Sequence, residues 1–140
     1  RPSIMSTIKA NTLLHSDGSS TTQPSIPALD TRMAQAWLSM NGTGTVAIND
    51  SYNISSITDG GAGVYQANLT TAMSNTNFSV ALSIGYDGSV HDDDHMLGVK
   101  ELISSRTTSV VRVLCNLNTN GGSYTDNADV LMYNLIVFGA

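Results

Sequence analysis

Large apolar side chains stand at every second position from residue 78 to residue 84, in the run Phe-Ser-Val-Ala-Leu-Ser-Ile. Because successive side chains of a β-strand point to opposite faces, this period of two predicts a half-buried strand. Weaker forms of the pattern predict seven more strands, at residues 36–40, 45–50, 52–57, 64–70, 96–103, 108–117 and 130–138. Turns rich in Gly, Asn and Asp, which supply the positive φ that hairpins require, separate several of them, at residues 41–44, 58–63, 86–89 and 118–123. About eight short strands joined by such turns predict an all-β fold, a sandwich or a barrel of antiparallel strands, and of these we expect an antiparallel β-sandwich.

The charge content argues against several alternatives. Charged residues make up 12% of the 140-residue chain, and the lysines and glutamates that commonly solubilise helices are limited to Lys9, Lys100 and Glu101. Long amphipathic helices are therefore not expected. The net charge is −5 and Lys and Arg nowhere cluster, which argues against a nucleic-acid partner because phosphate binding depends on those cations. No apolar run approaches the roughly 20 residues that span a bilayer, so no membrane insertion is expected.

The first 35 residues differ in amino-acid composition from the rest. Residues 15–27 are rich in Ser, Thr, Gly and Pro and offer almost nothing to bury, which predicts an extended arm or linker. Residues 5–14 alternate enough to predict a short strand, and such a strand fits the sheet edge of another subunit. The predicted organisation is an N-terminal arm, residues 1–35, followed by a β-sandwich domain, residues 36–140.

The last predicted strand is apolar on both faces. Alternate positions form two apolar sets, which are Leu131, Tyr133, Leu135 and Val137, and Val130, Met132, Ile136 and Phe138. A strand of this kind is expected to be covered on both sides. It lies either at the centre of one sandwich or against a neighbouring subunit, and the residues alone do not separate the two.

The segment His91-Asp92-Asp93-Asp94-His95 is the one run of the sequence that brings several potential metal ligands or catalytic side chains together. Asp oxygens suit calcium and imidazoles suit zinc or nickel. However, consecutive Asp side chains on an extended backbone point to alternate sides, and the third histidine, His15, lies in the predicted arm. The segment is therefore predicted to be a solvated loop, with no metal and no cofactor. The alternatives are three copies that converge on one ion at a trimer axis, and contact with a receptor.

No sequence pattern typical of catalysis is present. The chain has one glutamate, Glu101, which is predicted to form a surface ion pair, and it has no GxSxG, HExxH or phosphate-binding glycine loop. We therefore do not expect an enzyme. Cys115 lies in an apolar alternation and is predicted to be a buried thiol. Trp37 is expected in the core, whereas Tyr86 and Tyr124, beside Gly-rich turns, are better placed to contact a ligand.

A longer pattern begins with Ala-Trp at residues 36–37. It continues with NGTGTV at 41–46, NISSITD at 53–59, Gly-Val-Tyr at 63–65, and LTTAM at 69–73 before an Asn-containing turn. This run, residues 36–80, resembles a module found at the ends of tail-fibre and related structural proteins of tailed bacteriophages, and the closing NLIVFGA resembles the end of such modules. Leu38, Met40 and Ser74 depart from the usual residues of the module, but these changes are tolerable in volume.

The resemblance implies a homotrimeric β-domain at the tip or side of a tail fibre, on a virion assembled in the host cytoplasm, without a catalytic site. The arm would bind other virion proteins, and the loops at 85–95 and 118–129 would contact a polysaccharide or an outer-membrane protein of the host. The residues expected to touch this receptor are Tyr86, Asp87, His91, Asp92, Asp93, Asp94, His95, Asn120 and Tyr124. The alternative is a capsid decoration protein or another virion structural protein that binds no receptor.

Overall fold

The computed structural model describes residues 32–85, 96–119 and 123–139, and residues 10, 12, 14, 16 and 18. For residues 96, 97, 117–119 and 123–126 it describes the backbone alone. The chain divides into two units, Arg1–Asp30 and Thr31–Ala140, and the second unit holds all of the described strands. The predicted arm falls mostly outside the described residues and stays a prediction.

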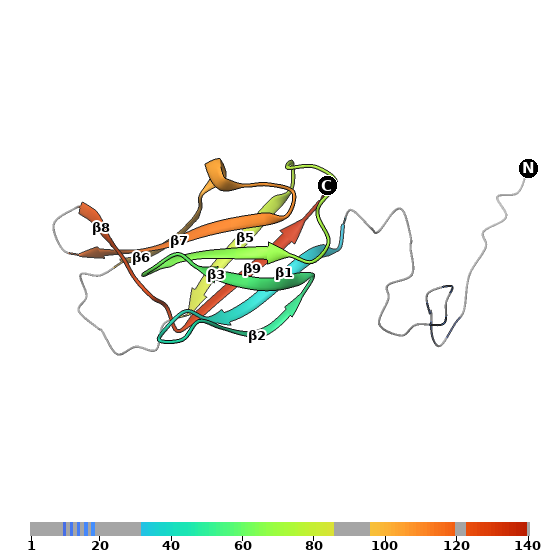
Figure 1. Cartoon of the computed structure of the whole chain (residues 1–140), viewed down its shortest axis with the longest axis horizontal. Coiled ribbons are helices and arrows are strands. Elements are labelled where there is room, and N and C mark those ends of the chain that lie inside the picture. Colours follow the sequence, from blue (N-terminus) through green and yellow to red (C-terminus); the bar gives the residue numbers. More distant parts are fainter. Residues whose placement is uncertain are drawn as a thin grey trace, which may run out of the picture. The chain divides into compact units, whose positions relative to one another are not determined.

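Two antiparallel sheets form the second unit (Figure 1). In the first sheet the order is β2-β1-β9-β5, with bounds Ala47–Tyr52, Ala34–Asn41, Met132–Phe138 and Ser79–Gly85. In the second sheet the order is β3-β4-β7-β6, with bounds Ile54–Asp59, Val64–Leu69, Val110–Thr119 and Met96–Glu101. A further strand, β8 (Ser123–Asn127), pairs with the C-terminal part of β7, and a short 3-10 turn, η1, spans Ile103–Ser105. The fold is therefore all-β, as predicted.

Each of the eight predicted stretches overlaps an observed strand, with shifts at the ends. The stretch predicted at 96–103 is a strand only as far as Glu101, because η1 follows. A larger error concerns residues 118–129, which were predicted to be a loop but contain β8. The sequence Ser-Tyr-Thr-Asp-Asn has no apolar alternation, and this strand exists through its pairing with β7, where Asn127 lies opposite Asn116. Pairing with β7, which ends at Thr119 shortly before β8 begins, needs no apolar alternation in β8 itself.

The core lies between the facing sides of the two sheets. Leu38, Leu135 and Leu82 occupy one cross-strand row of the first sheet, and Val111, Val113 and Cys115 come from β7 in the second sheet. Tyr65 and Tyr133 meet across the core with ring centroids 6.2 Å apart at a tilt of 45°. Burial of each large apolar side chain contributes about 1.5–3 kcal/mol. Cys115 is fully buried and unpaired, which confirms the predicted buried thiol.

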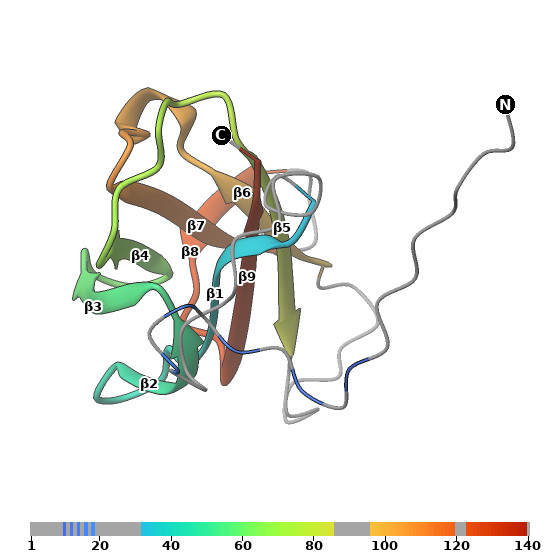
Figure 2. The same ribbon diagram turned by 90° about the vertical axis from the view of Figure 1, so that its right-hand side faces the viewer.

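The last strand, β9, departs from the expectation that both of its faces are covered. It lies between β1 and β5, and Tyr133, Leu135 and Val137 are buried as predicted (Figure 2). On the other face, Met132, Ile136 and Phe138 are between 38% and 45% exposed. Within the described part of the chain, the central position therefore covers one face of β9 and leaves the other open.

The position of Trp37 differs from the expectation that it lies in the core. It stands between Ala36 and Leu38, which are both buried, so its side chain projects from the opposite face of β1. There it lies opposite Tyr52 on one side and Ile136 on the other. Trp37 is half-buried on the outer face of the sheet, and the prediction of a core position is wrong.

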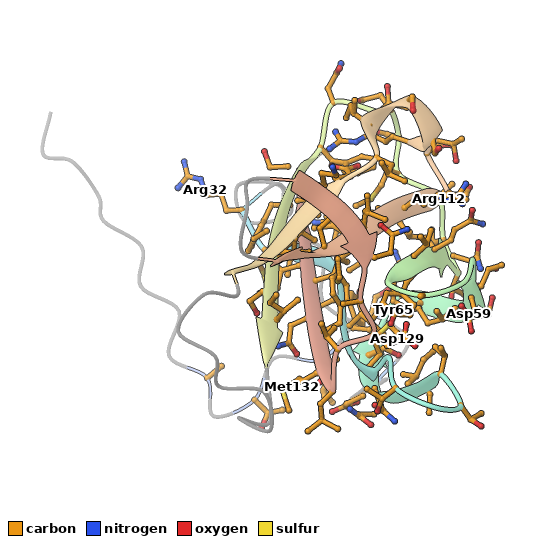
Figure 3. All side chains as sticks on the ribbon, turned by 90° about the vertical axis from the view of Figure 1, so that its left-hand side faces the viewer. Arg32, Asp59, Tyr65, Arg112, Asp129 and Met132 are labelled. Carbon is orange, nitrogen blue, oxygen red and sulfur yellow. The ribbon has the colours of Figure 1, made fainter. Side chains whose placement is uncertain are left out.

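A buried tyrosine joins the two sheets at one end of the sandwich. The Tyr65 hydroxyl donates to the carbonyl oxygen of Gly42 at 2.9 Å and lies 2.9 Å from Oδ1 of Asp129, which also accepts from the Gly63 amide at 2.8 Å. Figure 3 shows Asp129 beside Tyr65. Gly63 has φ +65°, and a Cβ there would lie 2.5 Å from the carbonyl oxygen of Cys115, so only glycine fits. Burial and the bond to Asp129 raise the pKa of Tyr65 far above its ordinary value.

An arginine closes the other end. Arg106 donates from Nε to Oε1 of Glu101 at 2.7 Å and from Nη2 to Oε2, while its Nη1 donates to the carbonyl oxygen of Phe78 at 2.7 Å. The guanidinium also stacks on the Phe78 ring, 4.4 Å from its centroid. The hydrogen bond to Glu101 raises the pKa of Arg106. Since both side chains are about 14% exposed or less, the predicted surface ion pair of Glu101 is instead a largely buried fork that holds β5 to the end of β6.

Candidate functional site

The receptor-contact residues predicted from the sequence lie largely outside the described structure. Residues 86–95, which include Tyr86, Asp87 and the His91–His95 segment, and Asn120 are not among the described residues, and Tyr124 is described only as a backbone position in β8. In the described part of the chain, no three His, Cys, Asp or Glu side chains come close enough together to hold a metal ion. No helix in that same part is long and apolar enough to cross a membrane.

An open recess of about 360 Å³ occurs where β2 passes into β3 and β4 ends. The described residues that line it come from three separate stretches of the chain and are Gln35, Tyr52, Asn53, Thr70 and Thr71. None of these side chains is charged. The recess therefore has the chemistry of a site for a neutral, hydroxyl-rich ligand.

Asn53 builds the floor of the recess. Its φ of 56° is in the left-handed region, which Asn tolerates better than most residues, and it carries the chain from one sheet to the other. Its side-chain nitrogen donates to the carbonyl oxygens of Gln35 at 3.0 Å and Thr71 at 3.1 Å, and its Oδ1 accepts from the Thr71 amide at 2.7 Å. Since its amide is engaged on both sides, Asn53 positions the three stretches and leaves ligand contacts to its neighbours.

Tyr52 supplies the aromatic surface of the recess. Of the three tyrosines with described side chains, Tyr65 and Tyr133 are buried in the core, whereas Tyr52 is 49% exposed. Thr70 and Thr71 are exposed as well and place hydroxyl groups beside it. An aromatic face stacks on the C–H face of a sugar ring while hydroxyls and amides bond to the rim of the ring. The arrangement suits a saccharide.

Two other recesses are less suited to that role. One of about 240 Å³ is lined by Gly98, Val99, Lys100 and Asn116, where the Asn116 amide already donates to Asn127 at 3.1 Å and no described lining residue is aromatic. The other, of about 250 Å³, lies on the outer side of β5 and β9 and is lined by Ala81, Leu82, Ser83, Asn134 and Ile136. It shares a sheet face with Tyr52.

Sequence reasoning missed this site because its parts are remote in the chain. Gln35 and Asn53 are 18 residues apart, as are Asn53 and Thr71. Gln35 also fell within the predicted arm, and Tyr52 was one of five tyrosines. The one local signal was the pair Tyr52-Asn53, an aromatic residue followed by a residue that tolerates positive φ. No protein-family model, curated protein or solved structure matches the chain.

Proposed function

We propose that the chain is a receptor-binding structural domain of a bacteriophage tail fibre, which binds a polysaccharide on the surface of the host bacterium. The observation that carries the proposal is the exposed Tyr52 ring beside the uncharged polar recess. The domain is proposed to bind without catalysing a reaction.

Two further features support this function. The run that resembles the phage modules, residues 36–80, contains four of the five recess residues. The recess also sits on strand ends held by Asn53, and a rigid sheet with binding groups at its margin is a common design for a recognition domain. A pre-formed site of this kind binds with little loss of conformational entropy.

The proposed partners follow from the same function. We propose that the chain assembles as a homotrimer in the virion, that the N-terminal arm binds other virion proteins, and that three recesses act together on one cell surface. Multivalent contact of this kind strengthens attachment by factors of about 10²–10⁴ without a tight single site.

The test is binding of the labelled full chain to a panel of bacterial strains and to their purified surface polysaccharides. We expect Tyr52→Ala to weaken binding about tenfold or more, which corresponds to about 1.4 kcal/mol, and Tyr52→Phe to retain most of it because the stacking ring remains. Ile103→Ala is the matched control, since Ile103 is 65% exposed on η1, outside the recess. Equal binding by all variants, or binding to protein receptors alone, would contradict a saccharide role for the recess.

A structural role on the capsid is the competing proposal, and the open apolar face of β9 favours it. Packing against a neighbouring virion protein would bury Met132, Ile136 and Phe138. Electron microscopy of particles labelled with an antibody to the chain separates the two: label on fibre ends supports attachment, and label on the head supports decoration.

A further inference from the structure

We propose that the outer face of the β2-β1-β9-β5 sheet binds a neutral, linear oligosaccharide laid across the strands, with the recess at Tyr52 as one end of the site. This inference rests on the proposed function and specifies its ligand. The site binds an extended chain of sugars, and a single terminal sugar does not fill it.

An apolar row crosses the whole sheet at right angles to the strands. Tyr52 of β2 lies opposite Trp37 of β1, Trp37 lies opposite Ile136 of β9, and Ile136 lies opposite Ala81 of β5. Directly paired residues point to the same face, and this face is the one opposite the inward-facing row Leu38, Leu135 and Leu82. Two aromatic rings and two aliphatic side chains therefore form one continuous strip beside the recess.

A polar row runs parallel to the apolar one. Two residues further along each strand, Asp50 lies opposite Ser39, Ser39 opposite Asn134, and Asn134 opposite Ser83. The Asn134 amide donates to the Ser83 hydroxyl at 3.3 Å. Residues two apart on a strand are separated by about 6.7 Å, so a sugar ring stacked on the apolar row places its hydroxyl edge toward the polar row.

The two recesses of this face mark the ends of the strip. The recess of about 360 Å³ adjoins Tyr52 on β2, and the recess of about 250 Å³ is lined by Ala81 and Ile136 on β5 and β9. Because neighbouring strands lie about 4.8 Å apart, the strip from β2 to β5 is about 14 Å long. That length exceeds one sugar ring and accommodates a short oligosaccharide. Figure 2 shows β1, β9 and β5 side by side along it.

The charge of the face selects the ligand class. Asp50 is the one charged residue among the four strands of this sheet, and it lies on the edge strand β2. An acidic polysaccharide would meet a carboxylate there and no compensating cation from these strands, so the face fits a neutral glycan.

The test measures binding of the full chain to defined neutral oligosaccharides, the β-1,4-linked glucose and N-acetylglucosamine series from monomer to hexamer, and to an array of neutral and acidic bacterial polysaccharides. We expect affinity to rise about tenfold or more with length and then level off once the strip is filled. Trp37 is the single tryptophan, so bound oligomers should change its fluorescence emission, whereas a ligand confined to the recess need not reach it.

A substitution at the far end of the strip gives the decisive comparison. Ala81 is exposed on β5, and Ala81→Arg should abolish the gain in affinity with length while leaving the weak binding of short ligands to the Tyr52 recess unchanged. Ala62→Arg is the matched control, because Ala62 is exposed in the turn between β3 and β4. Circular dichroism and thermal unfolding of both variants verify that each is folded.

The outcomes separate this inference from the proposed function. Binding that is lost in Tyr52→Ala but is independent of ligand length and of Ala81→Arg overturns the extended site and keeps the recess. Absence of binding to every glycan overturns both. If Ala81→Arg instead dissociates an oligomer in sedimentation velocity and leaves glycan binding intact, the face is a contact between copies of the chain and the inference fails.

Discussion

Two buried tyrosines should respond in opposite directions to the same substitution. Tyr133 is 1% exposed, and its hydroxyl has no hydrogen-bond partner among the described residues. Tyr65 is equally buried, but its hydroxyl donates to Gly42 and bonds to Asp129. Replacement by Phe removes one hydroxyl from each ring and preserves the packing. We expect Tyr133→Phe to stabilise the protein and Tyr65→Phe to destabilise it.

The magnitudes follow from the two environments. An unsatisfied buried polar group costs about 1–3 kcal/mol, because in the unfolded chain the same group is bonded to water. The void left by one oxygen atom destabilises the folded state by only a few tenths of a kcal/mol, at about 24 cal/mol per Å³. Tyr133→Phe should therefore raise the free energy of unfolding by about 1 kcal/mol, or Tm by about 4 °C. Tyr65→Phe removes the donor that the Gly42 carbonyl oxygen and Asp129 Oδ1 share, and of these two acceptors Oδ1 keeps its bond from the Gly63 amide. The substitution should therefore lower the free energy of unfolding by about 1–3 kcal/mol.

Urea unfolding followed by circular dichroism measures both effects, at one protein concentration because association would shift the midpoint. The urea midpoint should move in opposite directions, with the slope m unchanged. Destabilisation by Tyr133→Phe of more than about 0.5 kcal/mol would refute the reasoning, because it would mean that the hydroxyl has a partner in the folded protein, such as an ordered water.

Three further predictions concern the buried polar groups. Arg106→Lys should lower the free energy of unfolding, measured in urea, by about 1–3 kcal/mol, because an ammonium cannot form the fork to Glu101. Arg112→Lys is the control: its position has no ion pair among the described residues, so the free energy of unfolding should change by less than about 0.5 kcal/mol. Burial raises the pKa of Cys115 from 9.0 to about 11, so the folded state favours the protonated thiol. The free energy of unfolding is therefore unaffected below about pH 9 and falls by up to about 3 kcal/mol as the pH rises through 11. The test is the difference in unfolding free energy between the wild type and Cys115→Ala across that range, and a constant difference would contradict the prediction. Gly42→Ala places a Cβ against the Tyr65 hydroxyl and 2.9 Å from the Val130 carbonyl oxygen, so it should lower the free energy of unfolding by about 2 kcal/mol or more. Its effect should not add to that of Tyr65→Phe, because both changes act on the same contact. Additive losses in a double-mutant cycle would show that the two residues act independently.

Local periodicity predicted most of the strands. The alternation in β5 correctly predicted that Leu82 points inward, because a side chain's face depends only on its parity within an extended strand. In β9, where both faces are apolar, the alternation did not distinguish the inner set, Tyr133, Leu135 and Val137, from the outer one. Trp37 was expected in the core because it is apolar and lies in an alternating strand. Its parity groups it with Gln35 and Ser39, whereas the wholly apolar set of β1, Ala36, Leu38 and Met40, faces the other sheet.

The candidate site depended on contacts that no local pattern contains. Gln35, Tyr52 and Thr71 meet because Asn53 ties three stretches of backbone together, and the apolar strip exists because the register aligns Tyr52, Trp37, Ile136 and Ala81. The sequence by itself determined that this protein is built of strands with one buried side each. The tertiary structure alone decided which strands are neighbours, which apolar face stays open and where the recess lies, because register and strand order are set by hydrogen bonds between residues far apart in the chain.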